Sequence, residues 1–184
     1  MTFLVPYAST HGHTAKIAER IATVLRGDGI AVDVHDLRAS DAPAPTGYEA
    51  VVAGGSIHHG RHQRELVEWA RRHAAGLSLV PSAFFSVSLA AAEDSDEARA
   101  TARDYLEDLE DAAGWLPDLR VSFAGALQYR EYDFPTRLAM RLLMARGGHP
   151  TDIGRDFDYT DWDAVDAFAR DCARLGRTTQ SLSG

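Results

Sequence analysis

The sequence predicts an α/β fold: a doubly wound parallel sheet of five strands with helices on both faces. Three observations lead to it. Short apolar runs alternate with helical patterns along the 184 residues. Some runs, such as Val51–Ala53 and Ala83–Phe85, are apolar throughout, which is typical of strands covered on both faces. Polar or glycine-rich segments follow three of the runs, at the sheet edge where ligands bind in such folds.

Strands are expected where apolar and β-branched residues cluster, and helices where apolar residues recur every three or four positions. The predicted strands are Thr2–Tyr7, Ala31–Asp36, Ala50–Gly54, Ser82–Leu89 and Leu119–Ala126. The predicted helices are Thr14–Arg26, Gln63–Ala75, Asp96–Ala113 and Asp161–Leu175. Thr160 is expected to cap the last helix. Pro43 and Pro45 argue against a full helix between the second and third strands.

A segment at 127–159 exceeds what a five-stranded domain needs, and it is predicted to be an insert before the last helix. Its middle, 135–146, has the pattern of an amphipathic helix, with proline in the first turn and glycines after the last. The whole domain, insert included, is expected to span residues 1–176. The polar tail at 177–184 is expected to be disordered.

The insert carries basic and aromatic side chains close together. Arg137 and Arg141 share one face of its predicted helix, and Tyr129, Tyr132 and Phe134 precede that helix. Two interpretations remain open for it. The helix packs on the edge of the domain, or it forms a basic amphipathic surface for a membrane or a lipophilic substrate.

Composition narrows the class of protein. A hydrophobic content of 45% and a charged content of 25% are ordinary for a globular domain. The net charge of −8 argues against nucleic acid as a partner. The single cysteine, Cys172, excludes an internal disulfide and a cysteine-rich metal site. No apolar run approaches the roughly 20 residues that span a membrane, so the expected location is the cytoplasm.

The segment between the first strand and the first helix is the clearest candidate site. A helix N-terminus favours negative charge, and a glycine there lets the backbone approach a ligand closely. No lysine follows the glycine, so this is not a Walker loop, and the three spaced glycines of a dinucleotide fingerprint are absent. An uncharged loop with hydroxyl groups suits a terminal monophosphate such as that of FMN. Its residues are Ser9, Thr10, His11, Gly12, His13 and Thr14.

Two further segments follow neighbouring predicted strands, at 54–60 and at 86–91. Because the carboxyl ends of parallel strands meet at one edge of a sheet, we expect both to converge on the phosphate loop. Three such segments at one edge indicate a binding site more strongly than any one of them.

These segments resemble the flavodoxin-type FMN domain and, more narrowly, the menaquinone-dependent protoporphyrinogen oxidase (protoporphyrinogen IX dehydrogenase) family. The resemblance covers nearly the whole chain. It is carried by Tyr7–Thr14, Gly55–Gly60, Pro81–Leu89, Ala124–Tyr129, the insert ending near Gly147 and Gly148, and Tyr159–Trp162.

The resemblance implies FMN as the cofactor and electron transfer from porphyrinogen through FMN to a quinone, in heme biosynthesis. The phosphate loop would hold the FMN phosphate. The insert residues Tyr129, Tyr132, Phe134, Arg137 and Arg141 would contact porphyrinogen, quinone or the inner face of the cell membrane. The isoalloxazine ring would lie between Ser56, Ile57, His58, His59 and Gly60 on one side and Ser86, Val87, Ser88, Leu89 and Ala90 on the other.

The sequence identifies no catalytic residue. His58, His59 and His62 are weak candidates for proton transfer, and the alternative is that they only shape the pocket. No carboxylate is spaced to complete a metal site with them. Two other functions stay open: a flavodoxin-like electron carrier that docks on protein partners, and an FMN-dependent quinone reductase without porphyrinogen activity. The second stays open because family members often place an aromatic residue where His59 stands.

Overall fold

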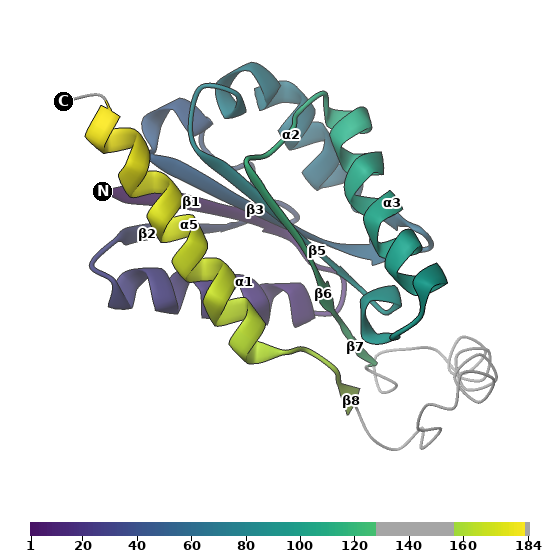
Figure 1. The fold of residues 1–184 in the computed structure, drawn as a ribbon. Helices are drawn as coiled ribbons and strands as arrows, with labels where there is room; N and C mark the ends of the chain where they lie inside the picture. The colour runs from purple at the N-terminus through teal and green to yellow at the C-terminus, as the bar shows by residue number, and fades with distance from the viewer. Residues whose placement is uncertain (128–156, 183–184) are drawn as a thin grey trace.

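The computed structural model describes the backbone of residues 1–127 and 157–182 (Figure 1). Five strands form a parallel sheet in the order β2-β1-β3-β5-β6. Chain order reverses beside β1, so a crevice for ligands is expected where β1 and β3 diverge into their loops. The fold predicted from sequence is confirmed. The strands are β1 (Thr2–Ala8), β2 (Ala31–Asp36), β3 (Ala50–His58), β5 (Ser82–Ser88) and β6 (Leu119–Ala124).

Helices cover both faces of the sheet (Figure 1). Successive side chains of β5 point to opposite faces: Phe85 packs with the cluster of α1 and α5, and Phe84 with that of α2 and α3. Every residue of β5 is buried, the apolar run Ala83–Phe85 and the serines at 82, 86 and 88 alike. The helices are α1 (His13–Gly27), α2 (Arg64–Leu77), α3 (Asp96–Ala113) and α5 (Trp162–Leu182).

The third strand is longer than predicted. Instead of ending at Gly54, β3 continues to His58, turns, and returns as the antiparallel strand β4 (Arg61–His62). The two glycines that favour a loop serve close packing within the strand. A Cβ atom at Gly54 would lie 2.0 Å from the ring of Phe85. The turn residues, His59 and Gly60, have φ angles of 50° and 75°, as in a type I′ hairpin turn.

The last helix differs from the prediction at both ends. It is capped by Asp161, whose Oδ1 accepts the N–H of Ala164 at 3.0 Å, and not by Thr160. The helix also runs to Leu182, seven residues past its predicted end at Leu175 and through most of the tail expected to be disordered. The segment between β2 and β3 holds only a 3-10 turn, η1 (Pro45–Gly47), consistent with the absence of a full helix there.

The two ends of the insert lie side by side. A short strand after β6, β7 (Ala126–Leu127), pairs antiparallel with β8 (Phe157–Asp158), which leads into α5. The predicted helix at 135–146 falls outside the described residues. The same is true of Tyr129, Tyr132, Phe134, Arg137 and Arg141.

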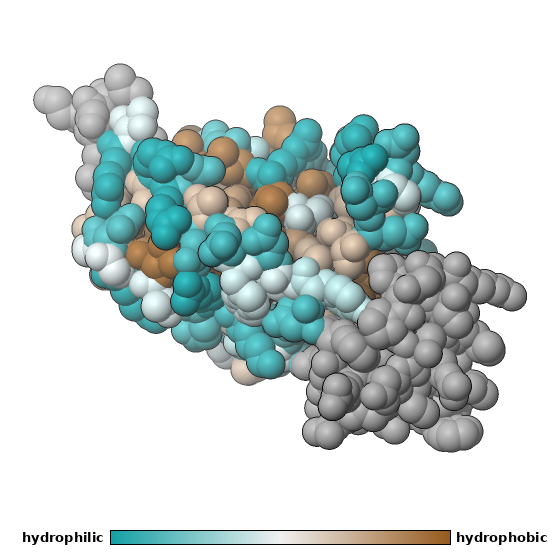
Figure 2. All heavy atoms as spheres, turned by 60° about the horizontal axis from the view of Figure 1, so that its bottom comes forward, coloured by the Kyte–Doolittle hydropathy of each residue, from teal (hydrophilic) through white to brown (hydrophobic). Residues whose placement is uncertain are grey.

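Hydrophilic side chains surround small hydrophobic patches on the side of the molecule in Figure 2. This is the surface expected of amphipathic helices that turn their apolar faces to a sheet. Trp69, Trp115 and Cys172 lie in the core, each 1% exposed. Among the described helices, none combines the length and the apolar character needed to cross a membrane.

Candidate functional site

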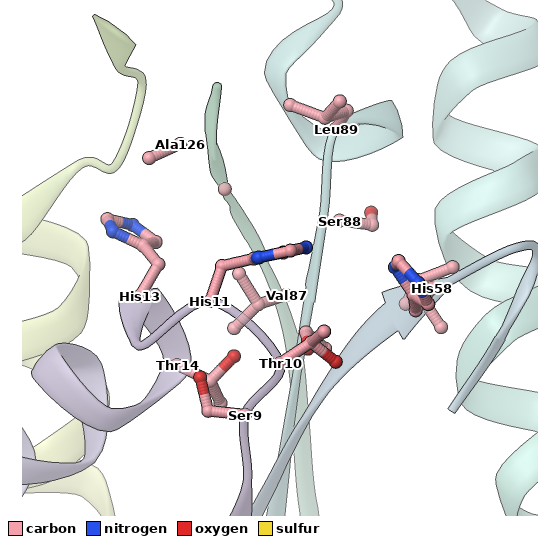
Figure 3. A pocket seen from close by; sticks show the side chains of 13 residues that line it. Ser9, Thr10, His11, His13, Thr14, His58, Val87, Ser88, Leu89 and Ala126 are labelled. Atoms are coloured by element: carbon pink, nitrogen blue, oxygen red, sulfur yellow. The ribbon is translucent and has the colours of Figure 1, made fainter. Parts of the chain in front are cut away.

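A cavity of about 80 Å³ opens at the carboxyl ends of the parallel strands (Figure 3). Hydroxyl and imidazole side chains make up much of its wall, which suits a small polar group such as a phosphate. Four segments contribute to its wall: the β1–α1 loop, the end of β3, the end of β5 and the start of β7. The lining residues are Ser9, Thr10, His11, His13, Thr14, Ser56, Ile57, His58, Val87, Ser88, Leu89, Gly125 and Ala126.

The structure therefore brings together most of the residues that the sequence predicts for the flavin site, and it leaves five outside the cavity wall. Gly12 occupies the N-cap position of α1, and Ser86 is fully buried. His59 and Gly60 form the exposed hairpin turn, and Ala90 begins the 3-10 turn η2 (Ala90–Ala92). Gly125 and Ala126 line the cavity without having been predicted as site residues, because the prediction extended β6 through them.

The phosphate loop is built to receive an anion. Ser9 is only 8% exposed, and its Oγ has no hydrogen-bond partner among the described residues. Gly12 adopts φ 80° at the start of α1, no side chain caps that helix, and no acidic residue lies in its first turn. The first-turn N–H groups of α1 therefore have no side-chain acceptor from a cap. The buried, unpaired hydroxyl of Ser9 destabilises the folded protein by about 1–3 kcal/mol until it forms a hydrogen bond with a ligand oxygen. The loop therefore fits a phosphate.

Arg38 supports the loop from the turn that follows β2. Its Nη1 donates to the carbonyl oxygen of Ser9 at 2.8 Å, and its Nε lies 4.0 Å from Glu65. The guanidinium adds positive charge beside the loop. Sequence reasoning missed Arg38, although it lies two residues after β2, the strand that pairs with β1.

Gln63 joins the phosphate loop to the end of β3. Its Nε2 donates to Thr10 Oγ1 at 3.1 Å and also to Ser56 Oγ. Its Oε1 accepts the backbone N–H of Ser56 at 3.1 Å. The sequence pattern predicts Gln63 as the first residue of the next helix and indicates no role for it, because nothing in the sequence shows that a hairpin turns it back over β3.

His62 lies behind the cavity and does not line it. Its Nε2 is 3.0 Å from Ser86 Oγ, and its ring packs edge-on against Phe84. Burial lowers the pKa of His62 to about 4, so the ring is neutral at pH 7. His62, one of the three histidines considered for proton transfer, therefore packs behind the cavity wall.

Three imidazoles lie close together, two of them in the cavity wall. The ring centroids of His11 and His58 are 5.7 Å apart, and those of His58 and His59 are 4.2 Å apart. Burial lowers the pKa of His58, and His59, His11 and Arg38 lower it further. His58 lines the cavity, whereas His59 does not line it and packs edge-on against the ring of His58.

His13 connects the start of α1 to Thr160, the residue that follows the insert. Thr160 Oγ1 donates its single proton to the carbonyl oxygen of Ala124 at 2.8 Å. The bond of 2.7 Å between Thr160 Oγ1 and His13 Nε2 must then run from the ring nitrogen to the hydroxyl. Asp158 lies 3.6 Å from the same nitrogen. Burial is the main influence on His13 and lowers its pKa.

Comparison with known proteins identifies relatives along nearly the whole chain. The chain is 36% identical over 173 residues to a protoporphyrinogen IX dehydrogenase (quinone) of Leishmania major, covering 94% of this chain and 74% of that one. It is 34% identical over 178 residues to the protein of the same name from Escherichia coli strain K12, covering 95% and 96%.

Solved structures share the fold at low sequence identity. Oxidised flavodoxin 1 from Bacillus cereus matches with a TM-score of 0.53 at 15% identity, over 95% of this chain and 98% of that one. The rubredoxin oxygen:oxidoreductase of Desulfovibrio gigas matches with a TM-score of 0.57 at 14% identity, over 96% of this chain and 36% of that one. Both matches support the flavodoxin-like arrangement of the sheet.

The family profile of the flavodoxin domain matches residues 4–153. This match and the curated relatives confirm the resemblance inferred from the sequence motifs, and a flavodoxin domain indicates a flavin cofactor. The chain belongs to the flavodoxin domain family and, within it, to the family of the protoporphyrinogen IX dehydrogenases (quinone).

Proposed function

We propose that the protein binds FMN and catalyses the oxidation of protoporphyrinogen IX with a quinone as electron acceptor, a step of heme biosynthesis. The observation that carries this proposal is the identity of 34–36% to relatives of that name over 94–95% of the chain. The cavity at the strand ends supports it independently, because its hydroxyl groups and helix N-terminus suit a monophosphate.

In this proposal the phosphate loop anchors the cofactor. Ser9, Thr10 and Thr14 donate their hydroxyl protons to the phosphate, and the first-turn N–H groups of α1 add further donors. The guanidinium of Arg38, which donates to the carbonyl oxygen of Ser9, adds positive charge near the loop. These contacts need no rearrangement of the loop, since Gly12 already holds the backbone in its left-handed conformation.

Bound FMN would supply the two-electron chemistry of both half-reactions. The chain's own residues position substrate and exchange protons. Ile57 and Leu89 line the cavity on its β3 and β5 sides and limit the access of water. We assign proton exchange with solvent to His58, and its exposure and its position in the cavity wall support this assignment. The lowered pKa of His58 keeps its imidazole neutral near pH 7, ready to accept a proton.

The insert would give access to the two lipophilic substrates. Its two ends meet in the β7–β8 pair directly beside the cavity, because Ala126 belongs both to β7 and to the cavity wall. We therefore expect Tyr129, Tyr132, Phe134, Arg137 and Arg141 to contact porphyrinogen, quinone or the inner face of the cell membrane. A cytoplasmic protein with peripheral membrane contact is consistent with a quinone that resides in the bilayer.

The decisive experiment is an anaerobic assay of protoporphyrinogen oxidation by the FMN-loaded protein, with and without a menaquinone analogue. We expect porphyrin formation that depends on the quinone, and FMN binding visible as quenching of flavin fluorescence. A protein that binds FMN but oxidises no porphyrinogen contradicts the proposed activity. Quinone reduction by another donor would then favour the quinone reductase, and reduction only by protein partners would favour the electron carrier.

A further inference from the structure

We infer that Gln63 is a positioning residue that sets the direction of the hydrogen bonds inside the flavin site. It makes the hydroxyls of Thr10 and Ser56 act as donors toward the bound ligand. The inference rests on the proposed binding of FMN. It concerns a residue outside the cavity wall, which acts through two residues that line it.

The orientation of the Gln63 amide follows from the chemistry of its neighbours. The backbone N–H of Ser56 can only donate, so the atom 3.1 Å from it must be the amide oxygen Oε1. The amide nitrogen then faces the two hydroxyls, which is where its bonds to Thr10 Oγ1 and Ser56 Oγ lie. A flipped amide would set its NH₂ group against another N–H donor.

This orientation fixes the role of both hydroxyls. Each hydroxyl has a single proton, and each oxygen accepts from the amide nitrogen of Gln63. The hydroxyl protons are therefore directed elsewhere, and both residues line the cavity. Thr10 can give its proton to a phosphate oxygen, and Ser56 can give its proton to an acceptor on the ring side. One neutral amide thus aligns two donors from two strand ends.

The packing around Gln63 leaves it little freedom. A Cβ atom at Gly55 would lie 2.4 Å from Leu66 Cδ2 and 3.5 Å from Gln63 Oε1. The strand therefore needs glycine at that position so that the start of α2 can approach. The close approach holds the amide against Ser56, and Gln63 makes no capping bond to its own helix because its side chain is used here.

The test compares Gln63→Glu with Gln63→Met. Both substitutions keep the length of the side chain, and both remove the amide donor. Only Glu reverses the polarity: its carboxylate must accept the protons of Thr10 and Ser56 and also places a negative charge near the phosphate. We expect Gln63→Glu to weaken FMN binding at pH 8 by roughly 100-fold and Gln63→Met by roughly 10-fold. Fluorescence quenching gives both dissociation constants.

The dependence on pH separates polarity from packing. Burial and the nearby phosphate charge raise the pKa of the introduced carboxyl, and once protonated it can donate one hydrogen bond again. The affinity of Gln63→Glu relative to wild type should therefore recover in part between pH 8 and pH 5. The ratio for Gln63→Met should stay constant, and dividing by the wild-type value cancels the titration of the phosphate itself. Riboflavin, which lacks the phosphate, should show a smaller loss than FMN in Gln63→Glu.

Equal losses in both variants at every pH would overturn the inference, as would a Gln63→Glu protein that binds FMN within twofold of wild type at pH 8. Thr10→Val provides a second route that leaves Gln63 intact. It removes the same donated proton, so unchanged FMN binding in a folded Thr10→Val protein also overturns the inference. Wild-type protein that binds no FMN overturns the proposed function, and this inference with it.

Discussion

The two ends of the site are built in opposite ways. The phosphate loop is held by side chains from three other segments of the chain: Arg38, Gln63 and Thr160. The tip of the β3–β4 hairpin, 58–60, is exposed and contacts the rest of the site mainly through imidazole rings. The difference indicates a division of work. A preorganised loop provides affinity for the phosphate, and an open hairpin leaves the ring end accessible to substrate.

The largest effect is expected from breaking the preorganised loop. Gly12→Val combined with Thr14→Ala forces a β-branched residue into the left-handed backbone conformation and removes one hydroxyl donor. The strain and the lost bond to a charged group together amount to about 3 kcal/mol, so FMN affinity should fall by roughly 100-fold. Titration of flavin fluorescence measures the loss.

Gly29→Val is the matched control for this pair. Gly29 has nearly the same φ, 79° against 80°, and a Cβ atom would meet open space at either glycine. It lies in the turn after α1 and does not line the cavity. The control should lower the free energy of unfolding and retain FMN. Loss of FMN in both proteins would show that general instability, not the loop, is responsible.

His62, in the second strand of the β3–β4 hairpin, should make the free energy of unfolding depend on pH. His62 has a pKa of about 4 in the folded protein and about 6.5 when unfolded, so the unfolded state binds more protons between these values. Stability should therefore fall as pH is lowered from 6.5 to 4, by about 3 kcal/mol from this group alone. His62→Gln should abolish that part of the loss. Urea unfolding of the FMN-free proteins at pH 7 and pH 4.5 measures the difference, and parallel profiles would contradict the role of His62.

A smaller effect on stability and on FMN affinity is expected where the phosphate loop contacts Thr160, the residue that follows the insert. Thr160→Val removes both the bond to His13 and the bond to the carbonyl oxygen of Ala124. It should lower the free energy of unfolding by about 1–2 kcal/mol and FMN affinity only several-fold. Thr160→Ser keeps the hydroxyl and should behave like wild type. A loss of the same size in Thr160→Ser would mean that the methyl group, and not the hydrogen bonds, stabilises this junction.

The two ends of the site also differ in how far they can be predicted from the sequence. Ser9–Thr14 lies within one local strand–turn–helix pattern, so periodicity and hydroxyl content suffice to predict it. The supports of that loop come from residues 29 to 147 positions away, such as Arg38 and Thr160, and only the strand order brings them there. The hairpin was missed because Gly54 and Gly55 favour a loop in isolation, and their packing against Phe85 and Leu66 is visible only in three dimensions.

The smallest effect is expected at the hairpin tip, and it tests whether His59 takes part in binding at all. His59 has φ 50° and precedes Gly60 at 75°, and Asn-Gly is the preferred pair for such a turn. His59→Asn should therefore raise the free energy of unfolding by about 0.5 kcal/mol or less, since Asn adopts positive φ more readily. It should change FMN affinity less than about twofold, because His59 does not line the cavity. A tenfold loss of FMN affinity would instead place this imidazole against the flavin and make the open end of the site part of its anchor.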